Sequence, residues 1–330
     1  MSRLVSLDFL RFIAVLLVIG RHSFPLYQWA YGPIAFISDF FKSVGYLGVD
    51  LFFVISGFLV SGLLFKEIKE TGRVRIIRFY IRRGFKIYPS FYIFLIASIF
   101  LLRPESNFLG EIFFLQNYIG GVWYHTWSLA VEEHFYLILP VLLVLIRPKL
   151  IPLLFPFLAI LTLAGRTAFG DGLMFETHFR IDALFFGVLL SYHHNFGSLD
   201  SIRSRAWVLF SIVLLLCAVC VPLAYTYTLA YLGFGILMVN ILNLDVRAIR
   251  PFAYIGKHSY SIYLWHEPVR LLVLAAIPSD FEERLLVNVI YIILSFVVGI
   301  SCAKIIEFPF LKLRDAVFAR RRPVLADAVA

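Results

Sequence analysis

Long apolar runs recur along almost the whole chain and are separated by short polar segments. A helix needs about 20 apolar residues to cross roughly 30 Å of hydrocarbon, and these runs approach or reach that length. The pattern therefore predicts about ten membrane-spanning helices and leaves no room for a soluble domain. The predicted spans are Leu4 to Arg21, Tyr46 to Phe65, Ile87 to Leu102, Trp127 to Ile146, Leu150 to Gly165, Phe179 to Tyr192, Trp207 to Val221, Leu229 to Leu242, Phe252 to Ile277 and Leu285 to Ile306.

The composition agrees with this pattern, because 61% of the 330 residues are hydrophobic, whereas soluble domains contain roughly 45 to 50% apolar residues. We therefore expect an all-α, polytopic membrane protein, with a transmembrane domain over residues 1–310 and a basic cytoplasmic tail over residues 311–330. The three cysteines fall inside apolar runs. Cys217 and Cys220 lack the loop context and the second ligand pair of a zinc site, so we expect no metal.

The net charge of +9 is compatible with a nucleic-acid partner, but the positions of the charges indicate a membrane topology instead. Most lysines and arginines fall in alternate connecting segments, whereas the other segments hold only Lys42, Arg103, Arg166 and Arg284. Basic residues gather on the cytoplasmic side of membrane proteins. We therefore expect both termini in the cytoplasm and no nucleic-acid partner.

The first apolar run carries three ionisable residues, Asp8, Arg11 and His22. A charged side chain inside a bilayer costs about 2.5 to 3.5 kcal/mol on insertion scales and usually marks a functional site. Arg11 and His22 are eleven residues apart, so they return to nearly one helix face with a rise of about 16 Å. Asp8 is one turn before Arg11 and can pair with it. Both charges interrupt the apolar core that a signal peptide needs, so we expect a retained helix.

Several more ionisable residues fall at the level of His22, in the outer half of the bilayer, when the ten spans are threaded alternately through it. They are Asp50, Glu132, Glu133, Arg180 and Asp182. Each alone fits a helix-end residue that reaches for water, whereas together they favour one shared cavity. Adjacent glutamates point about 100° apart on a helix, so we expect only one of the pair to face inward. For Asp50, Arg180 and Asp182, a structural ion network is an open alternative.

A basic segment precedes the third predicted span and includes Arg82, Arg83 and Lys86. The preference of basic residues for the cytoplasmic side accounts for such a segment. Attraction to anionic lipid, about 1 kcal/mol per basic residue, adds to this preference. Guanidinium groups also bind phosphate through two parallel hydrogen bonds. The segment therefore has two interpretations, a membrane-surface anchor or a phosphate site.

Six strings, in order along the chain, resemble the acyltransferase 3 family of multi-pass bacterial membrane acyltransferases. They are LDFLRFIAVLLVIGRH at 7–22, GVDLFFVISGFL at 48–59, RRGFKIYPSFY at 82–92, WSLAVEEHFYL at 127–137, RIDALFFG at 180–187 and YIGKHSYSIYLWHEPV at 254–269. The family's arginine and histidine, separated by ten residues, fall on Arg11 and His22. Its basic patch falls on Arg82, Arg83 and Lys86, although members usually carry arginine where this chain has Lys86.

This resemblance implies ten helices, cytoplasmic acyl-CoA as the donor, and transfer of an acetyl or related group to a hydroxyl of a glycan or glycolipid at the outer face. It also implies that Arg82, Arg83 and Lys86 hold the phosphates of CoA. His22 is expected to act as a general base or to become an acyl-imidazole first, and both roles stay open.

Other residues receive supporting roles in this interpretation. Arg11, paired with Asp8, is assigned to positioning or charge support. Asp50, Glu132 or Glu133 is expected to orient the imidazole or to hold acceptor hydroxyls. Arg180 is expected to bind an acidic acceptor or to brace a carboxylate. Asp182 and His266 are also assigned supporting roles.

We therefore expect an integral O-acyltransferase of the bacterial inner membrane that contacts membrane lipid and a glycan or glycolipid acceptor. A flippase or transporter of a lipid-linked saccharide, working without covalent chemistry, is the alternative from another functional class. A non-catalytic CoA sensor is a third. The chain ends soon after the last predicted span, so any extracytoplasmic partner is expected on a separate protein.

Overall fold

The computed structural model describes residues 2–24, 33–101, 108–170, 174–242, 247–277 and 284–319, and this part of the chain is 87% helix with no strand. Arg103 and the tail beyond residue 319 lie outside the described residues. The helices are α1 (Ser2–His22), α2 (Pro33–Val44), α3 (Gly48–Thr71), α4 (Ile76–Leu101), α5 (Leu109–Ile112), α6 (Gln116–Ile119), α7 (Trp127–Leu145), α8 (Ile151–Phe169), α9 (Thr177–Phe196), α10 (Arg205–Ala218), α11 (Leu223–Ile241), α12 (Arg250–Gly256), α13 (Ser259–Ala276), α14 (Arg284–Cys302) and α15 (Phe308–Ala319). A short 3₁₀ turn, η2 (Tyr124–Thr126), precedes α7, and a π-helical turn, η6 (Ala303–Glu307), follows α14.

Nine of the ten predicted runs each fall mainly on one helix, whereas the run Phe252 to Ile277 is divided between α12 and α13 by a turn at Lys257 and His258. Six helical segments of the described chain are long and apolar enough to cross a membrane. They are Phe36–Thr71, Ile76–Leu101, Tyr124–Leu145, Pro148–Phe169, Leu223–Ile241 and Leu285–Phe318. Large apolar side chains on these segments are exposed, as expected of surfaces that face lipid. The chain is a multi-pass membrane protein, whereas ten spans and cytoplasmic termini stay predictions.

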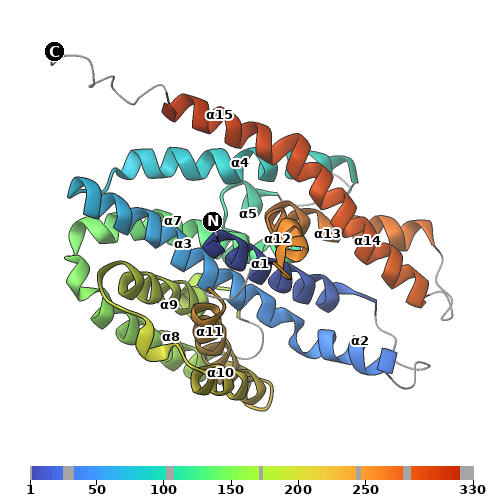
Figure 1. Cartoon of the computed structure of the whole chain (residues 1–330). Helices are drawn as coiled ribbons and strands as arrows, with labels where there is room; N and C mark the ends of the chain where they lie inside the picture. Colours follow the sequence, from blue (N-terminus) through green and yellow to red (C-terminus); the bar gives the residue numbers. More distant parts are fainter. Residues whose placement is uncertain are drawn as a thin grey trace.

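Helix α1 runs through the middle of the molecule (Figure 1) and packs against α2, α3, α12 and α13. Helices α8 to α11 lie on one side of it, and α12 to α14 lie on the other. This central position explains why α1 tolerates ionisable residues, because its polar face meets protein and not lipid.

Glycines bring α3 and α9 unusually close together. A Cβ atom at Gly57 would overlap the backbone carbonyl of Leu184, and a Cβ atom at Gly187 would overlap that of Val54. Small residues at such contacts let two helix backbones approach within a membrane. The close approach aligns the polar ends of α3 and α9 and so holds Asp50 next to Arg180.

Candidate active site

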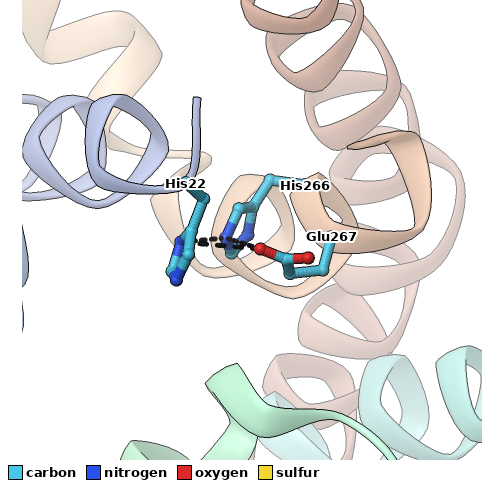
Figure 2. A group of neighbouring side chains, drawn as sticks. All are labelled: His22, His266 and Glu267. Atoms are coloured by element: carbon cyan, nitrogen blue, oxygen red, sulfur yellow. Dashed lines mark hydrogen bonds and ion pairs between the residues drawn. The ribbon is translucent and has the colours of Figure 1, made fainter. Parts of the chain in front are cut away.

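Two histidines from distant parts of the chain meet at the end of α1 (Figure 2). Nδ1 of His22, the last residue of α1, lies 3.0 Å from Nε2 of His266, which is in the middle of α13. Glu267 follows His266, and its Oε1 atom lies 3.7 Å from Nδ1 of His22. Its other oxygen accepts a 2.8 Å hydrogen bond from Nε of Arg270. The site therefore combines an imidazole pair with a carboxylate that a guanidinium orients.

The hydrogen bond between the two imidazoles has a defined direction. Nδ1 of His266 lies 2.5 Å from the backbone carbonyl of Tyr263, and a carbonyl oxygen only accepts, so this nitrogen carries the proton. In neutral His266 the Nε2 atom then accepts, and Nδ1 of His22 must donate to it. The Nε2 atom of His22 therefore keeps a free lone pair, and it points away from His266 and Glu267 in Figure 2.

The same three side chains resemble a metal-binding set. His22, His266 and Glu267 offer one ligand atom each, and these atoms lie within 4.8 Å of one another. Two imidazoles and a carboxylate suit zinc or another divalent transition metal. The hydrogen bond between the imidazoles accounts for the closest of these distances without an ion.

His22 opens into a cavity of about 430 Å³, which we call the histidine cavity. The exposed fraction of the His22 side chain is 27%, so a substrate in this cavity can reach the ring. Aromatic rings make up much of the wall, and His125, Glu267, Arg180 and Arg270 add polar groups. The aromatic lining residues are Tyr46, Trp123, Tyr124, Trp127, Phe175, Tyr227 and Tyr263. Apolar and aromatic walls with a few placed polar groups are typical of a small-molecule site.

A second cavity, which we call the charged cavity, contains most of the remaining predicted site residues. Its cations are Arg11 of α1, Arg83 and Lys86 of α4, and Lys257 at the end of α12. Its carboxylates are Glu132, Glu133 and Glu307. Val49 and Tyr263 line both cavities, so the two spaces adjoin at these side chains.

Neutral hydroxyl groups hold the three carboxylates of the charged cavity. Tyr136 donates to Glu132 at 2.7 Å, Tyr88 donates to Glu133 at 3.1 Å, and Ser261 donates to Glu307 at 2.7 Å. Among the described residues, the cavity's cations form one ion pair, the predicted contact between Arg11 and Asp8 at 2.7 Å, which is confirmed. The other three cations of the cavity therefore remain available to an anionic ligand.

The predicted basic patch divides into two parts. Arg83 and Lys86 line the charged cavity. Arg82 instead lies 5.3 Å from the ring centroid of Phe318 in α15, next to Arg78, which contacts the same ring. Residues 82 and 83 point in different directions because adjacent positions on a helix are rotated by about 100°.

The expectation of one shared cavity needs correction. His22 and Arg180 line the histidine cavity, whereas Glu132 and Glu133 line the charged cavity with Arg11. The two glutamates also both face that cavity, contrary to the expectation that only one does. Glu132 reaches along its own helix to Tyr136, and Glu133 reaches across to α4. Sequence position sets depth along a helix, but the rotation of each helix decides which cavity its side chains enter.

Asp50, Arg180 and Asp182 belong to a buried ion network. Arg180 donates to Asp50 at 2.8 Å and packs over the ring of Tyr227. Asp182 pairs with Arg166, which the sequence placed in a loop, and both side chains are at most 1% exposed. The carboxylate beside His22 is Glu267 and not Asp50, so the network braces the helices while Arg180 also reaches the histidine cavity.

Sequence reasoning missed four residues of these sites: His125, Glu267, Glu307 and Arg166. Glu267 lies next to His266 in the string SIYLWHEPV, so a check of the neighbouring positions finds it. His125 precedes the string WSLAVEEHFYL by two positions. Glu307 lies in the π-helical turn, a feature often found at functional sites.

Comparison with known proteins relates this chain to membrane acyltransferases. The acyltransferase 3 family, described as an acyltransferase domain, matches residues 4–304. A Staphylococcus aureus (strain COL) protein named "Putative O-acetyltransferase" is 30% identical over 94% of this chain and 58% of its own length. The "Peptidoglycan O-acetyltransferase OatA" of Listeria monocytogenes is 24% identical over 93% of this chain and 56% of its own length. The "O-acetyltransferase OatA" of Staphylococcus aureus (strain NCTC 8325) is 26% identical over 96% of this chain.

The chain spans less than two thirds of the length of these relatives. No solved structure matches it. The family match covers nearly the whole chain and contains both histidines of the pair as well as both cavities up to residue 304. On this match, the chain belongs to the acyltransferase 3 family.

Proposed function

We propose that this protein is a membrane O-acyltransferase that moves an acetyl group from acyl-CoA to a hydroxyl of a glycan. One observation carries the proposal: the direction of the His22–His266 hydrogen bond leaves the Nε2 lone pair of His22 free at the histidine cavity. A neutral imidazole with a free lone pair is a suitable base for a hydroxyl proton near neutral pH. The names of the relatives support O-acetyl transfer.

The charged cavity is the proposed site for the phosphates of acyl-CoA. Arg83, Lys86 and Lys257 line it, and none of the three is paired with a carboxylate in the described part of the chain. Arginine and lysine are the usual phosphate ligands. We propose that this cavity faces the cytoplasm, that both termini lie on that side, and that the chain crosses the bacterial inner membrane ten times.

The reactive end of the donor then has to reach the other cavity. Because Val49 and Tyr263 line both spaces, a thin pantetheine arm anchored at the charged cavity has a short route past Tyr263 to His22. Arg11, held by Asp8, adds positive charge along this route. The route explains why the family pairs an arginine with a histidine on one face of the first helix.

The chemical step is a direct exchange at the thioester carbon. The acceptor oxygen forms a bond to the carbonyl carbon while Nε2 of His22 takes the hydroxyl proton, and the carbon–sulfur bond breaks. The CoA thiolate then leaves and takes that proton back from His22. Glu267, 3.7 Å from Nδ1 of His22, stabilises the imidazolium that exists between these events.

The proposed acceptor is a carbohydrate on the opposite side of the membrane from the donor. The aromatic rings of the histidine cavity offer apolar faces for sugar rings. A relative named as a peptidoglycan O-acetyltransferase makes peptidoglycan the first acceptor to examine.

A transfer assay tests the function. Purified protein in liposomes receives acetyl-CoA labelled in the acetyl group and a panel of peptidoglycan fragments, chito-oligosaccharides and lipid-linked disaccharides. We expect one CoA released per labelled glycan. Movement of an unlabelled lipid-linked saccharide across the liposome, with no labelled product, contradicts the proposal and supports a flippase. Tight CoA binding without turnover contradicts it in favour of a sensor.

Replacing Arg83 by alanine is expected to raise the KM for acetyl-CoA about 10-fold or more, because a hydrogen bond to a charged group contributes about 1.5 to 3 kcal/mol. The KM for the glycan should stay unchanged. Arg78→Ala is the matched control, since Arg78 has the same charge on the same helix but contacts Phe318. Equal effects of the two variants on the KM would show that general surface charge, and not a phosphate site, attracts CoA.

A further inference from the structure

His125 is a third histidine at the histidine cavity, and the proposed function does not use it. It lies in the 3₁₀ turn η2, and only 2% of its surface is exposed. Its ring packs at 4.9 Å from the ring of His266, with an interplanar angle of 77°. The hydroxyl of Tyr263 donates to its backbone carbonyl at 2.5 Å. These contacts hold His125 in the same cavity wall as the catalytic pair.

The turn that carries His125 is anchored through Trp123, the residue that precedes it. Glu111 in α5 accepts the backbone N–H of Trp123 at 2.9 Å, and the Trp123 indole donates to Ser98 at 2.8 Å. Burial raises the pKa of Glu111 above its ordinary value. A residue two positions from such an anchor has little freedom to move, so the orientation of the His125 ring is a fixed property of the fold.

A proline in α13 sets the protonation of this ring. Pro268 has no N–H, so the carbonyl of Leu264, four residues earlier, lacks its helical hydrogen bond. Nε2 of His125 lies 3.2 Å from that carbonyl. Because a carbonyl oxygen only accepts, Nε2 must carry the proton and Nδ1 must carry the lone pair in neutral His125.

The lone pair on Nδ1 of His125 accepts no hydrogen bond from the described part of the protein. Nδ1 of His125 is buried and has no hydrogen-bond partner among the described residues. Leaving a buried polar atom unsatisfied costs about 1 to 3 kcal/mol, and such atoms in native proteins are commonly explained by a function or by a bound molecule. His125 lines the cavity that His22 faces, so a molecule in that cavity is the natural partner.

We propose that Nδ1 of His125 binds the acceptor by accepting a hydrogen bond from a hydroxyl next to the one that reacts. This inference rests on the proposed function and assigns an acceptor-binding residue within it. The acceptor class is a carbohydrate with at least two neighbouring hydroxyls. Binding the second hydroxyl at His125 orients the first toward Nε2 of His22, since both histidines line this cavity and both contact His266, His125 through its ring and His22 through a hydrogen bond.

Two variants separate the two nitrogens of His125. In His125→Asn the amide oxygen replaces Nδ1 as the acceptor, whereas in His125→Gln the amide N–H replaces Nε2 as the donor to Leu264. We expect His125→Gln to raise the KM for the glycan about 10-fold or more and to leave the KM for acetyl-CoA unchanged. His125→Asn should keep the glycan KM within about 3-fold of wild type. The glycan is the panel member that the wild-type protein acetylates fastest.

Pro268→Ala provides the folding control. The new amide N–H can bond to the Leu264 carbonyl, which repairs the helix when His125→Asn removes the Nε2 donor. The double variant should therefore recover any stability that the single Asn variant loses, while its glycan KM stays near wild type.

Three results overturn the assignment. If His125→Asn raises the KM for the glycan and His125→Gln leaves it unchanged, then His125 serves only to donate a hydrogen bond to the carbonyl of Leu264. A shift in the KM for acetyl-CoA means that Nδ1 binds the donor. An unchanged glycan KM in all variants removes His125 from acceptor binding. In each case the wild-type protein still transfers acetyl groups, so these results leave the proposed function intact, whereas absence of wild-type transfer overturns both.

Discussion

Replacing His22 by alanine lowers the rate of acetyl transfer by about 1,000-fold, within the roughly 10² to 10⁴-fold that a positioned general base contributes. The KM for acetyl-CoA is expected to stay near wild type, because the proposed CoA phosphate site is in the other cavity. Initial rates with labelled acetyl-CoA measure both quantities. A His22→Ala variant that keeps more than half of the activity contradicts the proposed role of the imidazole.

His266 provides the matched control for this result. In His266→Gln the amide oxygen can accept the Nδ1–H of His22 in place of Nε2, whereas His266→Ala leaves that N–H without its partner. We expect the Gln variant to keep more activity than the Ala variant. An acetyl group retained on wild-type protein without acceptor, and absent from His22→Ala, would identify an acyl-imidazole intermediate in place of general base catalysis.

A chelator distinguishes the hydrogen bond from a metal site. The His22, His266 and Glu267 atoms are close enough to hold an ion, but the proposed mechanism uses only their protons. Activity should therefore survive dialysis against EDTA. Loss of activity that zinc restores, together with zinc bound in the wild type and absent from His266→Ala, would contradict the general-base mechanism.

The sequence predicted features that depend on local spacing. Helices at all ten apolar runs and the contact between Asp8 and Arg11 follow from apolar length and from a separation of three residues. The expectation of a role for His22 also came from local sequence, namely from the cost of an ionisable residue in a membrane helix, and it stays a prediction. These inferences need no knowledge of how the helices pack.

Features that depend on packing could not be predicted from spacing. His22 and His266 are 244 positions apart. The local sequence around either histidine does not indicate that the two side chains will be in contact. The direction of their hydrogen bond depends on a carbonyl of Tyr263 that only the folded chain brings into place. The separation of Glu132 from His22 into different cavities depends on the rotation of α7, which the sequence pattern leaves free.

Arg166 shows that the length of an apolar run does not fix where a helix ends. The predicted span ended at Gly165, so the arginine was counted with a loop, but α8 continues to Phe169 and buries the guanidinium completely. All five N–H donors of this guanidinium have acceptors. The acceptors are Ala224 O, Phe179 O, both carboxylate oxygens of Asp182, and Thr228 Oγ1. Arg166 thus joins α8, α9 and α11.

Replacing Arg166 by methionine is therefore expected to destabilise the protein by about 3 to 5 kcal/mol, the usual loss when one partner of a buried ion pair is removed. The Asp182 carboxylate, 1% exposed, then loses its ion-pair partner. At roughly 2 to 4 °C per kcal/mol for large domains, Tm should fall by about 10 °C. Thermal unfolding in detergent, followed by loss of monodisperse protein, measures the change.

Two further variants decide how this loss arises. Arg203→Met, which removes a cation from an exposed i,i+3 pair with Asp200, should leave Tm unchanged. Arg166→Met combined with Asp182→Leu should recover at least half of the lost Tm, because the unpaired charge is then gone and only hydrogen bonds remain broken. If the double variant is as unstable as Arg166→Met alone, then the guanidinium's bonds to Phe179, Ala224 and Thr228, and not its charge, hold α8 against α9 and α11.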